Sequence, residues 1–198
     1  MRTKRGVALL LIDVINGFDF EGSEGLVAAA IPAALCIEAL ARRARRLGVP
    51  VVYVNDNFGQ WRSNFEATVQ ECTKRTQPGH AVVARLRPRR GDYFVLKPRH
   101  SGFFYTPLPL LLEHLGVDTL VLTGFATNLC VLFTANDAHM LGYHVRIPAD
   151  CTASNTAGLT RAALAQVREA LRADVRSSKE WDPLAIGPRR KKPTGHAL

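Results

Sequence analysis

Apolar residues gather in short runs along the chain, and longer stretches with apolar residues on one side and charged residues on the other separate these runs. A short continuous apolar run fits a strand that is buried on both faces of a sheet. The run Val7–Val14, for example, carries a single acid near its end. The runs that predict strands are Val7–Val14, Val51–Val54, Asp92–Leu96, Thr119–Thr123, His144–Ile147 and a short sixth strand at Asp174–Arg176.

The stretches between these strands predict helices. Pro32–Leu47 places Ala, Leu and Ile on one side and arginines on the other, and the Gly48 and Pro50 that follow are typical of a helix end. Asn55–Asn64 is rich in Asn, Gly and Ser, which favours a loop. The predicted helices are Pro32–Leu47, Leu108–Leu115, Leu129–Leu141 and Ala157–Leu171.

The alternation of strands and helices predicts an α/β fold. Strand–helix–strand units join parallel strands, so we expect a three-layer α-β-α architecture, Rossmann-like, with helices on both faces of a central parallel sheet. The length of 198 residues suits one domain. We place this domain at residues 1–182 and expect residues 183–198 to form a basic, disordered tail.

The charge of the chain is strongly positive. The formal net charge is +9, and four of the cations lie in the stretch Arg189–Lys192 near the end of the chain. Further cations cluster between Arg42 and Arg46 and between Arg85 and Arg90. Such clusters can attract nucleic acid or anionic metabolites, but a solvated surface is the simpler interpretation. We therefore expect a small-molecule substrate and no nucleic-acid partner.

The apolar runs and the cysteines indicate the cellular location of the protein. No run of about 18 uncharged apolar residues is present, so we expect no membrane span. The basic start Met1–Arg5 suggests a secretory signal as an alternative, but Asp13 interrupts the apolar run that follows and no convincing cleavage site comes after it. Four cysteines lack C-x-x-C and metal-binding spacing, which predicts free thiols and a cytoplasmic location. They are Cys36, Cys72, Cys130 and Cys151.

Three reactive residues fall where predicted strands end. Asp13 ends the first strand, Lys97 ends the third, and Cys130 lies in the first turn of the helix that follows the fourth. In an open α/β sheet, ligands bind beyond the carboxyl ends of the strands. A parallel sheet can therefore bring the three side chains into one site although they lie far apart in sequence.

Each of these residues has a chemical use in nucleophilic catalysis. A thiol at a helix N-terminus beside a lysine is shifted toward thiolate, which is the nucleophile. A neighbouring carboxylate can take the thiol proton and deliver it to a leaving amine. Singly, each residue also has an ordinary interpretation: the acid as a cap, the lysine as a surface group and the cysteine as core filler. Their occurrence at three strand ends favours the catalytic interpretation.

Three sequence blocks strengthen the catalytic interpretation of these residues. They are ALLLIDVINGF around Asp13, FVLKPRHSGFFYTPL around Lys97 and LVLTGFATNLCVLFTANDA around Cys130. From about Val7 to about Leu171, the chain resembles the isochorismatase-like cysteine hydrolases, the superfamily of nicotinamidase and N-carbamoylsarcosine amidase. The resemblance implies that Cys130 attacks a carbonyl carbon, Asp13 handles its proton and Lys97 stabilises charge, so that a C–N bond is cleaved through a thioester.

The resemblance also implies a backbone arrangement. The family keeps a cis peptide bond before the alanine of its G-x-A-T motif, which here is Phe125–Ala126. The N–H groups of Ala126 and Cys130 would then form an oxyanion hole. True isochorismatases cleave a vinyl ether and do not need the cysteine, so Cys130 favours acyl transfer, with vinyl-ether hydrolysis as an alternative.

One family feature is missing. Nicotinamidases hold a metal through a D-x-H pattern after the second strand, whereas Asp56 is followed here by Asn57 and Phe58. One carboxylate is not a zinc site, so we predict no catalytic metal and no cofactor. Homo-oligomers, dimers or tetramers, are the expectation from the family.

Aromatic residues in the loops near these strand ends are candidates for the substrate pocket. Aromatic rings favour a flat or apolar small substrate, although hydrophobic core has the same composition. Arg62 or Arg99 could pair with a substrate carboxylate. The candidate rings are Phe18, Trp61, Phe104 and Phe125.

Two alternatives belong to other functional classes. A non-enzymatic binding protein on the same fold could use the basic clusters and tail for nucleic acid or an anionic ligand, but it has no need of the Asp13, Lys97 and Cys130 set. A nucleotide-dependent oxidoreductase would carry G-x-G-x-x-G after the first strand, and none is present. Cys36 fits packing, and Cys72 and Cys151 are given no catalytic role.

Overall fold

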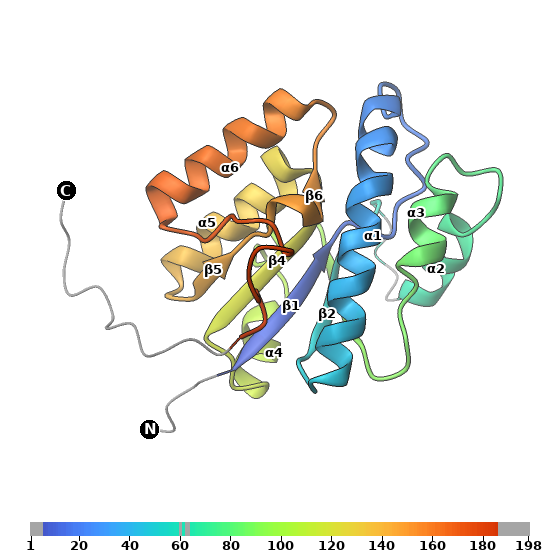
Figure 1. Cartoon of the computed structure of the whole chain (residues 1–198). Coiled ribbons are helices and arrows are strands. Elements are labelled where there is room, and N and C mark those ends of the chain that lie inside the picture. The colour runs from blue at the N-terminus through green and yellow to red at the C-terminus, as the bar shows by residue number, and fades with distance from the viewer. Residues whose placement is uncertain (1–5, 60, 62–63, 186–198) are drawn as a thin grey trace.

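The computed structural model describes residues 6–59, 61 and 64–185, and the account below is confined to them. Its centre is a six-stranded sheet in the order β3-β2-β1-β4-β5, with β6 paired to β4 (Figure 1). Every pairing is parallel. The strands are β1 (Val7–Ile12), β2 (Val51–Asp56), β3 (Tyr93–Lys97), β4 (Thr119–Phe125), β5 (His144–Arg146) and β6 (Thr152–Ala153).

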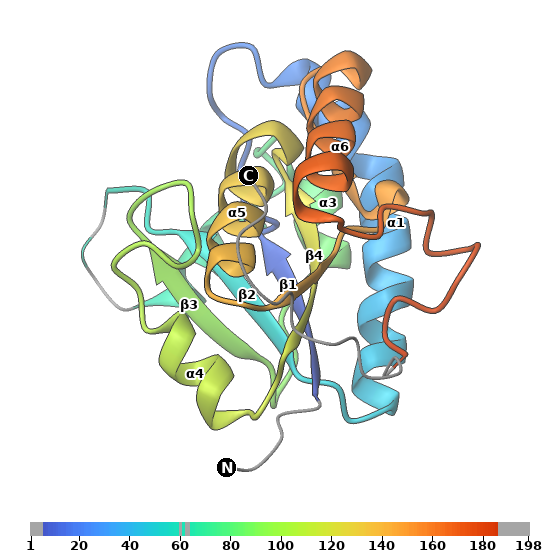
Figure 2. The ribbon, with the colours of Figure 1, turned by 90° about the vertical axis from the view of Figure 1, so that its left-hand side faces the viewer.

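Helices cover both faces of this sheet. They are α1 (Glu24–Arg46), α2 (Phe65–Cys72), α3 (His80–Arg85), α4 (Leu108–His114), the π-helical turn η1 (Thr127–Val131), α5 (Leu132–Met140), the 3₁₀ turn η2 (Ala149–Cys151) and α6 (Ala157–Leu171). Figure 2 shows α1 on one side of the sheet and α4 and α5 on the other. The predicted three-layer α/β fold is therefore confirmed.

Alternation along β1 divides the interior into two cores. Leu9 and Leu11 pack with α1, α2 and α3, whereas Leu10 and Ile12 pack with α4 and α5 on the opposite face. All six residues of β1 are buried, as expected for a central strand of a parallel sheet. This strand carries Asp13 at its carboxyl end, so the acid is held by the best-packed part of the fold.

Helix α1 begins two turns earlier than predicted. Pro32 lies inside the helix and is exposed, rather than at its start. Leu26 and Ala30, which precede it, are buried on the core face, and their packing offsets the hydrogen bond that proline cannot donate. By length and hydropathy alone, α1 could cross a membrane. Its row of buried residues against the sheet is that of a core helix.

Two other predictions need correction. The sixth strand at Asp174–Arg176 is reduced to a single parallel bridge between Arg146 and Asp174, and the sixth strand is instead β6. The domain also continues past residue 182. Leu184 is buried in the core, and the Arg146 guanidinium donates to the carbonyls of Pro183 and Ala185 at 2.7 and 2.6 Å. The basic stretch Arg189–Lys192 lies outside the described residues.

Candidate active site

The site forms where the strand order reverses. In the strand order, β2 neighbours β1 on one edge and β4 neighbours β1 on the other edge. Where the order reverses in this way, a crevice opens beyond the carboxyl ends of the strands. Gly124 has a φ of +112°, and a Cβ there would lie 2.0 Å from the carbonyl oxygen of Ile12. Only glycine permits this close approach of β4 to β1. It brings the turn that carries Cys130 next to Asp13.

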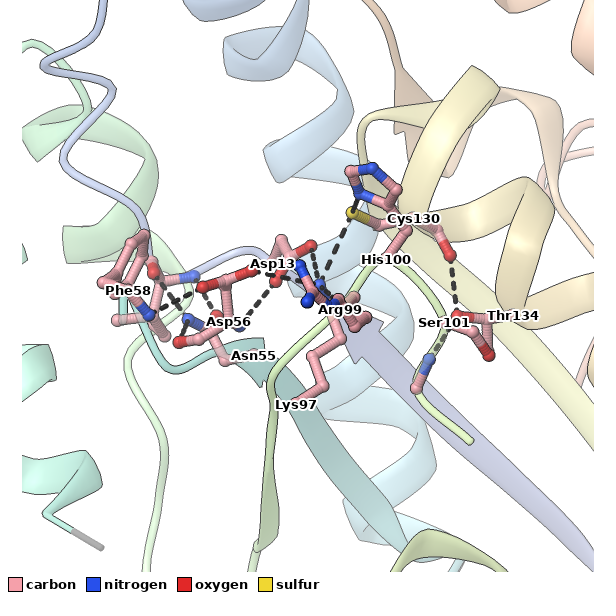
Figure 3. Close-up of polar contacts among 12 residues, drawn as sticks. Asp13, Asn55, Asp56, Phe58, Lys97, Arg99, His100, Ser101, Cys130 and Thr134 are labelled. Atoms are coloured by element: carbon pink, nitrogen blue, oxygen red, sulfur yellow. Dashed lines mark hydrogen bonds and ion pairs between the residues drawn. The ribbon is translucent and has the colours of Figure 1, made fainter. Parts of the chain in front are cut away.

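The three residues predicted from strand ends meet in this crevice (Figure 3). The Lys97 Nζ lies 2.8 Å from Asp13 Oδ2 and 3.5 Å from Cys130 Sγ. Lys97 has no exposed surface and Asp13 is 6% exposed, while Cys130 is half-buried. A buried ammonium thus joins a buried carboxylate to a sulfur that substrate can reach.

Neighbouring groups complete the surroundings of the ion pair. The Asp56 backbone N–H donates to Asp13 Oδ1 at 2.7 Å, and the Lys97 ammonium donates to the Arg99 carbonyl at 3.2 Å. The Asp56 carboxylate lies 3.7 Å from Lys97 Nζ. Asp56 is therefore the second acid beside the lysine. Among the described residues, no group of three or more His, Cys, Asp or Glu side chains is arranged to hold a metal.

The pKa of the thiol differs from the sequence-based expectation. Burial, followed by the negative charge of Asp13, raises the pKa of Cys130 to about 12, although Lys97 lowers it. The predicted shift toward thiolate is therefore wrong for the resting protein, because the dipole and lysine argument left out burial and the neighbouring acid. The sulfur is a neutral thiol at neutral pH, and it would need a base in order to act as a nucleophile.

Asp13 is suited to be that base. Burial raises the pKa of the Asp13 carboxyl above its ordinary value of 3.8, although Lys97 and hydrogen bonds, including one from Cys130, lower it. Burial lowers the pKa of Lys97, but the charge and hydrogen bond of Asp13, together with the neighbouring Cys130 and Asp56, outweigh burial, and the net shift is upward. Lys97 therefore remains a cation, and its charge opposes the burial that raises the pKa of Asp13.

A threonine connects the segment after β3 to the turn that carries Cys130. The Thr134 hydroxyl donates to the Cys130 carbonyl at 2.6 Å and accepts from the Gly102 N–H at 2.9 Å. The Ser101 hydroxyl donates to the Asp137 carboxylate one turn further along α5. These contacts set Lys97 and Cys130 relative to each other. The sequence blocks contained these residues, but no pattern singled them out.

Asn55 holds the segment after Asp13 in the same way. Its side chain is fully buried, accepts from the Ile15 N–H at 3.0 Å and donates to the Ile15 carbonyl at 2.9 Å. Asp13 itself has a φ of +51°, a left-handed conformation that aspartate tolerates better than most residues. Asn55 was predicted to begin a loop, and it instead belongs to β2.

The turn between β4 and α5 is fixed by one residue of β6 and one residue that follows β6. The Phe125–Ala126 peptide bond is cis. The Thr152 hydroxyl donates to the Gly124 carbonyl at 2.8 Å, and the Asn128 N–H donates to the Ser154 hydroxyl at 3.3 Å. Cys130 is the fourth residue of the π-helical turn η1, which leads directly into α5.

A histidine that the sequence-based reasoning missed lies at the sulfur. His100 Nδ1 is 3.8 Å from Cys130 Sγ, and the ring packs against Phe133 with centroids 5.5 Å apart. The residue is exposed, so it faces the open side of the crevice (Figure 3). Its position in the block FVLKPRHSG, three residues after Lys97, is the signal that could have found it.

A cavity of about 470 Å³ is lined in part by Asp56 and Arg99, two residues that contact the Lys97 ammonium. Of the four candidate rings, Trp61 and Phe104 line this cavity, and Phe18 and Phe125 do not. These two rings are buried and pack edge to face on each other, so they form part of the core. Arg62 lies outside the described residues. The lining consists of Asp56, Asn57, Gly59, Trp61, Pro98, Arg99, Phe104 and Tyr105.

Comparison with known proteins gives one consistent result. A model of the isochorismatase domain matches residues 7–180. The chain is 37% identical over 178 residues to the uncharacterized isochorismatase family protein YaaI of Bacillus subtilis, with 90% of this chain and 97% of YaaI covered. It is 35% identical over 193 residues to the ureidoacrylate amidohydrolase RutB of Methylobacterium radiotolerans, with 80% and 72% covered.

The fold comparison agrees. The crystal structure of N-carbamoylsarcosine amidase from Thermoplasma acidophilum superposes with a TM-score of 0.70 at 28% identity, covering 89% of this chain and 99% of that one. An isochorismatase family protein from Desulfovibrio vulgaris superposes with a TM-score of 0.72 at 30% identity, with 88% and 95% covered.

Proposed function

The chain belongs to the isochorismatase family of hydrolases, and from this premise we propose that it cleaves a C–N bond of a small amide, ureido or carbamoyl compound through a Cys130 thioester. The observation that carries the proposal is the Lys97 ammonium, 2.8 Å from the Asp13 carboxylate and 3.5 Å from the Cys130 sulfur. A buried ion pair in contact with a reachable thiol has a direct use in acyl transfer.

The first step transfers the thiol proton. Asp13 Oδ takes the proton of Cys130 while Sγ adds to the carbonyl carbon of the substrate. The thiol and the carboxylate both contact the same Lys97 ammonium. Lys97 stays protonated and stabilises the negative charge that passes from Asp13 to the reacting atoms.

Backbone groups hold the oxygen of the intermediate. As the carbonyl becomes tetrahedral, its oxygen gains negative charge and needs hydrogen-bond donors. We assign this role to the N–H groups of Ala126 and Cys130, at the start and the fourth position of the turn η1. Hydrogen bonds that fix this turn support the assignment: Thr134 donates to the Cys130 carbonyl, and Ser154 accepts from the Asn128 N–H.

The second half of the reaction releases two products. Asp13 returns its proton to the substrate nitrogen, the C–N bond breaks, and an amine or ammonia leaves behind a thioester on Cys130. Water then adds to the thioester carbonyl, the C–S bond breaks, and the thiol is restored. The chain needs no cofactor for either step.

The relatives support the substrate class. RutB is named as a ureidoacrylate amidohydrolase, and the Thermoplasma protein as an N-carbamoylsarcosine amidase. Here the adjoining cavity offers the Arg99 guanidinium, the Asp56 carboxylate and aromatic rings, a lining that suits a small polar substrate with a flat or conjugated part.

The test is a screen for ammonia release from ureidoacrylate, N-carbamoylsarcosine, nicotinamide and simple linear amides, with Cys130→Ala as the blank. We expect turnover of at least one ureido or carbamoyl compound by the natural chain and none by the variant. Turnover that persists in the Cys130→Ala protein would contradict the thioester and favour chemistry that needs no nucleophilic sulfur.

Two further expectations stay proposals. All four cysteines are free thiols, which supports the cytoplasm as the place of action. Apolar side chains with 42% to 74% of their surface exposed on and next to η1 and α5 support a dimer or tetramer, which light scattering would test. These are Leu129, Phe133, Met140 and Leu141.

A further inference from the structure

The groups around the Cys130 sulfur differ in their access to water. Asp13 is 6% exposed, and Lys97 has no exposed surface. His100 also contacts the sulfur, with Nδ1 at 3.8 Å from Sγ, and it is exposed. The reaction ends with attack by water on a carbonyl bound to this sulfur, so the base for that water should lie on the open side.

The three protons of the Lys97 ammonium all have partners, and each oxygen of the Asp13 carboxylate has one partner. Asp13 Oδ1 accepts from the Asp56 N–H, and Oδ2 contacts the Lys97 ammonium. That ammonium contacts Asp13, the Arg99 carbonyl and the sulfur, which accounts for its three protons. Both groups are arranged to serve the sulfur itself.

The position of His100 is fixed from both sides. The Arg99 carbonyl before it accepts from the Lys97 ammonium, and the Ser101 side chain after it donates to Asp137 on α5. Its ring rests against Phe133, which belongs to the same helix. An exposed histidine whose backbone is anchored and whose ring is packed can act on a nearby water molecule at a small entropy cost, because its side chain is already oriented.

We propose that His100 is a second catalytic residue, the general base that activates water for hydrolysis of the Cys130 thioester. The inference rests on the proposed function, since it needs that thioester. Water gives a proton to a His100 ring nitrogen while its oxygen adds to the thioester carbonyl. The C–S bond then breaks, and the proton held by the imidazolium returns to the departing sulfur. Asp13 serves the acylation half and His100 the deacylation half.

The two halves can be separated with p-nitrophenyl acetate as the probe. Its leaving group needs no proton, so a burst of nitrophenolate reports acetylation of the sulfur and the steady phase reports deacylation. In His100→Ala we expect an unchanged burst and a steady phase slower by about 100-fold, the size of a typical general-base contribution. Added imidazole should restore the steady rate at least in part, since the removed side chain is exposed.

Controls make each outcome decisive. His139→Ala removes another exposed histidine on α5 and should behave like the natural chain. A steady rate in His100→Ala equal to that of the natural chain, or a slowing that affects only the burst, overturns the role of His100 while leaving the thioester intact. A natural chain that hydrolyses the ester while Cys130 never carries an acetyl group, as judged by mass spectrometry after acid quenching, contradicts the proposed thioester itself, and the inference fails with it.

Discussion

Cys130 and Cys151 each lie beside an aspartate, and only Cys130 has the surroundings of a nucleophile. Cys130 contacts Asp13 after β4, and Cys151 lies 3.7 Å from the carboxylate of Asp150 in the turn after β5. Burial is the largest cause of a raised pKa for both thiols. Proximity to a carboxylate therefore does not distinguish them.

The difference lies in the partners of the two acids. Asp13 contacts the Lys97 ammonium, whereas Asp150 accepts from the Ser178 N–H and hydroxyl at 2.7 and 2.8 Å. Burial raises the pKa of Asp150, but the Ser178 hydrogen bonds outweigh it, so that its net pKa is lowered, opposite to Asp13. A carboxylate of lowered pKa is a poor base.

The two thiols also differ in their exposure to solvent. Cys151 has no exposed surface and packs in the core, while Cys130 is half-buried beside an exposed histidine. A nucleophilic role for Cys130 would therefore use an available base, a cation in contact and an open face, which Cys151 does not have together. Four predictions test which of these matters.

Removing each sulfur gives the largest contrast. Cys130→Ala should lower turnover of a substrate found by the ammonia screen at least about 1000-fold, as expected for loss of a nucleophile. Cys151→Ala should leave turnover within a few-fold and lower the free energy of unfolding by about 1 to 2 kcal/mol, because it empties a buried site. Steady-state kinetics and urea unfolding of both variants make the measurement. Equal losses of activity would remove the distinction.

Removing the cation should come next in size. Lys97→Met leaves Asp13 as an unpaired buried carboxylate, so turnover should fall at least about 100-fold and the free energy of unfolding by about 3 kcal/mol. The matched control is Arg45→Met, which breaks the Arg45–Asp92 ion pair far from the site. The control should lose stability and keep its turnover. Full activity in Lys97→Met would contradict the role of the ammonium.

Asp13→Asn should separate the reactivity of the thiol from catalysis. Asp13 is a cause of the raised pKa of Cys130, so its loss should lower that pKa and speed alkylation by iodoacetamide at pH 8 by about tenfold, one unit of pKa. Turnover should fall in the same protein, because the base is gone. Peptide mass spectrometry of the Cys130 peptide against time gives the rate. Slower alkylation would mean that Asp13 activates the resting thiol.

The smallest effect concerns Asp150. Its folded pKa lies below the ordinary 3.8, so ionised Asp150 stabilises the fold above about pH 4, and this contribution is lost as pH falls toward the folded pKa. Asp150→Asn should cost about 1 kcal/mol at pH 7, allowing for its partial exposure, and less at pH 2 to 3. Unfolding curves at both pH values test this. A variant whose deficit is the same at both pH values would assign the loss to packing.

The sequence predicted the parts of this site that depend on local order. Asp13 and Lys97 end apolar runs, and a parallel sheet brings such ends together, so their convergence follows from the pattern. The early start of α1 was missed because Pro32 resembles a first-turn proline, while Leu26 and Ala30 are buried only because the sheet is beneath them.

The features of the site that the sequence did not predict depend on contacts between different helices and strands. The Thr134 hydroxyl accepts a hydrogen bond from the Gly102 N–H, 32 residues away, and the Asn55 side chain accepts one from the Ile15 N–H, 40 residues away. No spacing rule marks such pairs. The pKa of Cys130 was predicted in the wrong direction for the same reason, because burial and Asp13 are supplied by the rest of the fold.

The proposed function requires that a substrate's acyl group passes through the Cys130 sulfur. Rapid acid quenching during the first turnover, followed by mass spectrometry of the peptide that contains Cys130, tests this. We expect an acyl mass on Cys130 that appears before the acid product and then decays. Product formed at full rate while Cys130 stays unmodified at every time point would contradict it.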